Sequence, residues 1–263
     1  MTVVSRRHVL LGSLAFATPA RAAEPLRIAA ASDLQVVLPL IAAAFERATS
    51  VASRLTFGST GNLARQIRQG APFDVFLAAD QQFILDLARD GIIPAVGPIY
   101  ARGRLAAIAR AGTDFAKLIV ASSDPIAAIA AVVGRGVAFR FAIANPEHAP
   151  YGRRAIEVLA SRGVLDQVRS RLVYGENVAQ AAQFVVTEAA AVGLIGSSLT
   201  YAPALKGGLE AVPIPPDWHA PLDQSLAVLP KAGPIARQFE AYLLDAAARD
   251  LLAAHGFDLP TRL

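Results

Sequence analysis

The stretch Phe57-Gly58-Ser59-Thr60-Gly61-Asn62 leads from an apolar strand into a helix through small and hydroxyl residues. The same kind of transition occurs in the segments 29–33, 145–152 and 175–178. The first backbone N–H groups of a helix have no partner within it, and this end carries roughly half a positive charge. Several such ends that meet form an anion site without lysine or arginine. The sequence therefore predicts capture of a small oxyanion between two lobes.

Strand and helix patterns alternate along the chain, which is typical of an α/β fold. Segments rich in glycine and proline, 92–98 and 207–216, interrupt the alternation twice. We therefore expect two lobes, each a mainly parallel sheet flanked by helices, with the ligand cleft between them. Residues 23–102 and 210–263 form the first predicted lobe, and residues 103–209 form the second. The predicted strands are 26–30, 73–78, 105–109, 137–144, 191–195 and 224–229, and the predicted helices are 34–45 (with a kink or a late start at Pro39), 63–69, 81–90, 152–162, 178–188 and 234–255 (in two pieces).

Residues 1–22 have the pattern of a cleaved export signal. The pair Arg6-Arg7 precedes an apolar run, 9–17, and Ala20-Arg21-Ala22 supplies the small-x-small cleavage pattern. Paired arginines before such a run are typical of the twin-arginine route. A surface arginine pair before a buried helix is the alternative, but no acidic residue precedes Glu24. We expect the mature protein in the periplasm.

Composition excludes several classes of function. The chain has 25 Lys and Arg against 21 Asp and Glu, and the three arginines of the signal account for most of the excess, so nucleic acid is not an expected partner. There is no cysteine, which excludes disulfides and thiol catalysis. The four histidines lack metal-ligand spacing, and no serine-hydrolase, metalloprotease or phosphate-loop motif is present. An enzyme is therefore not expected, and neither is a cofactor.

Five segments together resemble the molybdate-binding periplasmic proteins of ABC transporters. They follow one another in the family's order over essentially the whole chain after the signal, and they comprise residues 29–32, 57–67, 70–81, 145–152 and 174–178. The resemblance implies the type II periplasmic-binding fold and molybdate or tungstate as ligand. It also implies a membrane permease as partner, and we expect the protein to be a monomer. The metal would be held as its oxyanion, without direct protein ligands.

The resemblance also assigns the donors to the oxyanion. Ser32 would donate its hydroxyl and its amide, and Thr60 donates a hydroxyl where the family usually has serine. Tyr151 and Val178 would each donate a backbone amide. Some family members have a further tyrosine donor at the position of Gly196. Here either Ser197 or Ser198 replaces that donor, or one oxygen of the anion is bound by fewer groups.

Other interpretations of these residues remain open. Serine and threonine at such positions are often plain helix caps, and we expect Asn177 to cap the helix that begins at Val178. Asp33 cannot face a dianion without repulsion, so it is expected to support the first helical turn. A pocket of donors alone disfavours protonated phosphate. A receptor for another oxyanion such as sulfate is the alternative function, and a partner-binding module is a weaker one because it gives the four loops no purpose.

Overall fold

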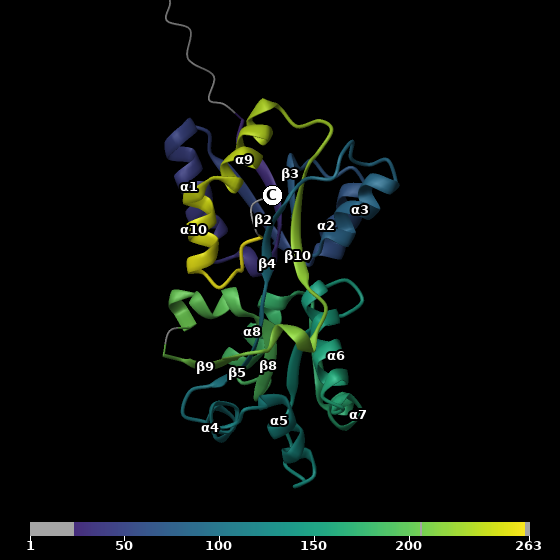
Figure 1. Cartoon of the computed structure of the whole chain (residues 1–263), viewed down its shortest axis with the longest axis vertical. Coiled ribbons are helices and arrows are strands. Elements are labelled where there is room, and N and C mark those ends of the chain that lie inside the picture. The colour runs from purple at the N-terminus through teal and green to yellow at the C-terminus, as the bar shows by residue number, and fades with distance from the viewer. Residues whose placement is uncertain (1–23, 206, 261–263) are drawn as a thin grey trace, which may run out of the picture.

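The computed structural model describes residues 24–205 and 207–260, so the predicted export signal lies outside it. The chain folds into two lobes arranged along the long axis of the molecule (Figure 1). Each lobe is built on a five-stranded sheet, and within the described residues no helix is long and apolar enough to cross a membrane. The predicted two-lobed α/β fold is confirmed.

The first lobe contains the beginning and the end of the described chain. Its strand order is β2-β1-β3-β10-β4. One cluster packs α1, α9 and α10 on one side of the sheet, and a second cluster packs α2 and α3 on the other. The elements are β1 (Leu26–Ala31), α1 (Leu38–Thr49), β2 (Ser53–Gly58), α2 (Thr60–Arg68), β3 (Val75–Ala78), α3 (Gln81–Arg89), β4 (Ile99–Gly103), β10 (Leu222–Val228), α9 (Pro234–Leu244) and α10 (Ala246–Ala254).

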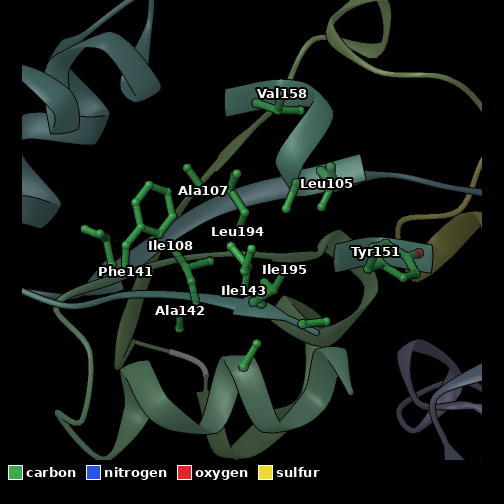
Figure 2. Packing of buried hydrophobic residues seen from close by; sticks show 14 of the residues in the cluster. Leu105, Ala107, Ile108, Phe141, Ala142, Ile143, Tyr151, Val158, Leu194 and Ile195 are labelled. Atoms are coloured by element: carbon green, nitrogen blue, oxygen red, sulfur yellow. The ribbon is translucent and has the colours of Figure 1, made fainter. Parts of the chain in front are cut away.

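The second lobe contains the middle of the chain. Its strand order is β7-β6-β8-β5-β9. Buried residues of the sheet and its helices form one cluster, and Figure 2 shows Tyr151 at its edge, away from Phe141. The elements are β5 (Leu105–Arg110), α4 (Asp114–Ala121), α5 (Pro125–Val133), β6 (Phe141–Ala144), α6 (Pro150–Ser161), α7 (Leu165–Val168), β7 (Leu172–Gly175), α8 (Val178–Val186), β8 (Val192–Gly196) and β9 (Leu209–Pro213).

The sheets are mixed rather than mainly parallel. Strand β10 is antiparallel to both β3 and β4, and β5 is antiparallel to both β8 and β9, while the other two pairings in each sheet are parallel. The reason is the route of the chain. Strands β5 and β10 each enter a sheet from the other lobe, so they run against the strands that build that sheet through βαβ units.

The two crossings between the lobes bear on the predicted boundaries. The first crossing lies between β4 and β5, beside the predicted boundary at residues 102 and 103. The second predicted boundary, between residues 209 and 210, falls inside β9, which pairs with β5 in the second sheet. The chain therefore returns to the first lobe after Pro213, later than predicted.

Most predicted elements agree with the structure to within a few residues. Helix α1 starts late, with Pro39 in its first turn, as the fixed φ angle of proline favours. The last helical segment is divided into α9 and α10, which meet at Asp245. The strand predicted over 137–144 is shorter, because only Phe141–Ala144 pairs with neighbouring strands.

Candidate functional site

The four strand-to-helix loops meet where the lobes face each other. They line a small cavity with about 180 Å³ of free space, part of which is open to solvent. Of the predicted donors, Ser32, Thr60, Tyr151 and Val178 all line this cavity, whereas Ser197 does not. The full lining is Ala31, Ser32, Asp33, Gly58, Ser59, Thr60, Ala79, Ala149, Pro150, Tyr151 and Val178. The structure thus brings together four residues that are up to 146 positions apart in the sequence.

Each of the four predicted donors at the cavity stands at the start of a helix. Ser32 opens the short 3-10 helix η1 (Ser32–Leu34) directly after β1, and Thr60 is the first residue of α2. Tyr151 follows Pro150 in the first turn of α6, and Val178 is the first residue of α8. Pairing of β1 with β2 and of β6 with β7 places these strand ends side by side in each sheet. The cavity is therefore surrounded by helix N-termini.

The hydroxyl of Thr60 is oriented by the backbone. Its Oγ1 accepts a hydrogen bond from the Ala79 amide at 3.1 Å, which leaves its proton free to donate elsewhere. Neighbouring Ser59 is engaged differently, since its Oγ lies 2.9 Å from Nδ1 of His148. Both side chains are buried. The arrangement favours Thr60 rather than Ser59 as a donor into the cavity.

Asn177 caps α8, as the sequence predicts. Its side-chain oxygen accepts hydrogen bonds from the amides of Ala179 at 3.0 Å and Gln180 at 3.1 Å. The cap thus uses the second and third amides of the helix. The amide of Val178, the first residue, is not one of the two that the cap takes.

A buried polar network forms the wall behind Ser32. Asp33 is fully buried, and its Oδ2 accepts a hydrogen bond from the Tyr151 hydroxyl at 2.9 Å and another from the Gln224 amide. The Tyr100 hydroxyl donates to Oε1 of Gln224 at 2.8 Å. Burial raises the pKa of Asp33 to about 6, although these hydrogen bonds and nearby backbone amides oppose the rise. Burial, and then the charge of Asp33, raises the pKa values of both tyrosines.

Sequence reasoning missed this network. It gave Asp33 a role in the first helical turn, whereas the structure also joins it to Tyr151 and Gln224, which lie 118 and 191 positions away. Neither partner carries a local motif that would signal the contact. A buried glutamine in β10 and a tyrosine after a proline are ordinary features, so no sequence signal was available.

The space beside Gly196 explains why no tyrosine stands there. A Cβ atom at this position would lie 3.1 and 3.2 Å from ring atoms of Tyr151 and 3.4 Å from Cβ of Asp33. The Tyr151 ring and Asp33 therefore take up the room that a larger side chain would need. The nearby Ser198 does not compensate, because its hydroxyl donates to the backbone oxygen of Asp33 at 2.7 Å.

Contacts around the cavity hold the two lobes together. The Gly61 amide donates to the His148 carbonyl at 2.9 Å, and a Cβ at Gly61 would come within 2.7 Å of that oxygen. The Arg154 guanidinium pairs with Asp80 at 3.0 Å, with each side chain 14% exposed. Asp80 also caps α3 through the Gln82 amide. The two lobes are therefore in direct contact beside the cavity.

Across 24–205 and 207–260, no group of three or more histidine, aspartate or glutamate side chains is placed to hold a metal ion. The polar groups at the cavity are hydroxyls and helix-start amides, together with Asp33. Such donors suit an oxyanion rather than a bare cation.

A two-lobed α/β structure with a small cavity between its lobes is typical of a solute-binding protein. A family model described as bacterial extracellular solute-binding protein matches residues 26–258, and the chain belongs to this family. The family comprises binding proteins rather than enzymes.

Relatives and solved structures agree with this membership. The chain is 34% identical to a molybdate-binding protein of Azotobacter vinelandii over 97% of this chain and 98% of that one. It is 33% identical to a molybdate-binding protein of Rhodobacter capsulatus over 88% and 85% of the two chains. The solved periplasmic molybdate-binding protein of Azotobacter vinelandii superposes with a TM-score of 0.78 at 26% identity, covering 90% of this chain and all of the other. The predicted family resemblance is confirmed.

Proposed function

We propose that this protein captures molybdate or tungstate outside the cytoplasm and delivers it to the membrane permease of an ABC transporter. The observation that carries the proposal is the convergence of Ser32, Thr60, Tyr151 and Val178 on one small cavity. The relatives named as molybdate-binding proteins support the choice of anion.

The donors suit a tetrahedral dianion. In the proposed complex, the hydroxyls of Ser32 and Thr60 and the amides of Ser32, Tyr151 and Val178 donate to its oxygens. Hydrogen bonds to a charged group contribute roughly 1.5–3 kcal/mol each, so a few of them are sufficient for tight binding. Because the ligand bridges both lobes, its binding favours the closed form.

Export and assembly belong to the same proposal. The arginine pair at residues 6 and 7 supports the twin-arginine route to the periplasm. We expect a monomer that docks on the permease when closed around its ligand, with no nucleic-acid partner. Loss of export in a variant with both arginines changed to lysine would test the route.

A titration of residues 23–263 with four anions tests the function. Molybdate and tungstate at a thousandfold excess over the dissociation constant should stabilise the folded protein by about 4 kcal/mol, which raises the melting temperature by several degrees. Sulfate and phosphate should have much smaller effects. Stabilisation by sulfate alone would change the substrate, and no response to any of the four anions would contradict the proposal.

A further inference from the structure

Asp33 is a negative charge at the wall of a cavity built for anions. It follows Ser32 directly, lines the same cavity and is fully buried. Its Oδ2 accepts two hydrogen bonds, while Oδ1 is buried without a hydrogen-bond partner. A buried carboxylate that lacks a compensating positive charge is costly. An arrangement of this kind next to a binding site calls for a functional explanation.

The groups that face Asp33 are neutral. Tyr151 approaches from α6 and Gln224 from β10, with Tyr100 of β4 behind Gln224. Ser198, from the 3-10 helix η3 (Ser197–Tyr201), donates to the backbone oxygen of Asp33. Among the side chains of residues 24–205 and 207–260 that the structure describes, no lysine, arginine or histidine forms a hydrogen bond or ion pair with the Asp33 carboxylate.

The basic groups near the cleft have other partners. Arg154 pairs with Asp80 and Glu157, and His148 contacts Ser59 and Glu176. A dianion bound at the Ser32 hydroxyl and amide would therefore add two negative charges within a few ångströms of an uncompensated carboxylate. Repulsion between like charges in an enclosed site strongly favours protonation of the weaker acid.

We propose that Asp33 takes up one proton from solvent when the oxyanion binds, so that the site captures a dianion together with a proton. The proton binds Oδ1, because Oδ2 already accepts from Tyr151 and Gln224. The enclosed charge is then −2 rather than −3. The proposal rests on the proposed function, since it requires an oxyanion in this cavity.

Protonation also changes what Asp33 offers to the site. A protonated carboxyl has an O–H donor where the carboxylate had an acceptor. This donor belongs to a residue that lines the cavity. Asp33 would thereby influence specificity, because the protonated carboxyl is a donor and favours a fully ionised dianion over an anion that carries a proton.

The expected signature is a proton-linked affinity. The pKa of Asp33 without ligand, about 6, leaves the carboxylate mostly ionised at neutral pH, so binding must recruit the proton. Affinity should then fall as the pH rises above this value, by up to tenfold per pH unit. The change Asp33→Asn keeps an oxygen acceptor for Tyr151 and removes the charge, so its affinity should be independent of pH and higher than wild type at pH 8.

Calorimetric titration of the mature protein with sodium molybdate measures the proton directly. Titrations at pH 7.5 in buffers of different ionisation enthalpy give the number of protons taken up, which we expect to approach one for wild type and zero for Asp33→Asn. His148→Gln is the matched control, because His148 is the histidine beside the cleft loops, and it should keep the wild-type proton uptake.

The outcomes separate this inference from the proposed function. Molybdate binding with no proton uptake between pH 6 and 8 would overturn the inference and leave the function intact. Uptake that disappears in His148→Gln would also overturn it. If the protein bound none of the four oxyanions, the proposed function itself would be contradicted. If Asp33→Asn fails to fold, the titrations of the wild type and of His148→Gln still show whether a proton is taken up and whether His148 is the group that binds it.

Discussion

The two lobes present different chemistry to the same cavity. The first lobe presents two hydroxyl side chains, Ser32 and Thr60, at the ends of neighbouring strands. The second lobe presents Tyr151 and Val178, and a valine has no polar group to offer except its backbone. The Tyr151 hydroxyl is already bound to Asp33 of the first lobe. In the proposed complex, the first lobe therefore donates through two side-chain hydroxyls and the Ser32 amide, whereas the second lobe donates through backbone amides alone.

This difference determines how the site can be changed. Side-chain substitutions remove donors of the first lobe directly, but they leave the amides of the second lobe in place. An amide is removed by proline, which is tolerated only at certain helix positions. Side-chain substitutions should therefore weaken binding more in the first lobe than in the second.

Removing both hydroxyls of the first lobe should have the largest effect. The double variant Ser32→Ala, Thr60→Ala should weaken molybdate binding by about 4 kcal/mol, or roughly a thousandfold in Kd, since each hydroxyl donates to a charged group. Calorimetric titration measures the loss. Ser197→Ala is the control, because its buried hydroxyl lies outside the cavity lining and its removal should leave Kd unchanged. Unchanged affinity of the double variant would remove these hydroxyls from the site.

Neutralising Asp33 should stabilise the ligand-free protein. The folded-state pKa of about 6 lies above the ordinary value of 3.8, so the folded state binds the extra proton between these values. Ionisation of Asp33 therefore lowers the free energy of unfolding increasingly as the pH rises from about 4 to about 6, and this loss reaches its full size above that range. Asp33→Asn should raise the free energy of unfolding by about 3 kcal/mol at pH 8 and by little at pH 4. Urea unfolding at both pH values measures this, and equal effects at the two would contradict it.

A proline at position 178 should remove a donor of the second lobe with the helix intact. Val178 is the first residue of α8, where proline is favoured, and the preceding Asn177 already has the extended conformation that proline requires. Val178→Pro should weaken molybdate binding by about 2 kcal/mol. Val178→Ala keeps the amide and should bind nearly as wild type does. Equal affinities of the proline and alanine variants would exclude the amide.

The smallest effect is expected from the Tyr151 side chain. Tyr151→Phe keeps the amide and removes one donor to Asp33, so molybdate affinity should change by no more than about 1 kcal/mol. Tyr174→Phe, at an exposed tyrosine in β7, is the matched control and should have no effect. A loss as large as that of the double hydroxyl variant would mean that the phenol contacts the ligand itself.

The sequence predicted local features well and tertiary ones poorly. The helix starts at Thr60 and Val178 and the cap at Asn177 depend on neighbouring residues, so their patterns are visible in the chain. The strand directions of β5 and β10 depend on where the chain crosses between lobes, which composition does not reveal. The same holds for Asp33, whose partners come from distant segments. No local motif indicates that a carboxylate such as that of Asp33 will be buried at a cost in free energy.

The position of bound molybdenum shows directly whether the oxyanion binds where the four helix starts meet. Crystals of the mature protein grown with sodium molybdate, measured with anomalous scattering at the molybdenum edge, should show one peak in the cavity. Its oxygens should lie within hydrogen-bond distance of the hydroxyls of Ser32 and Thr60 and the amides of Tyr151 and Val178. A peak elsewhere on the protein, or no peak at saturating molybdate, would contradict the proposed oxyanion site.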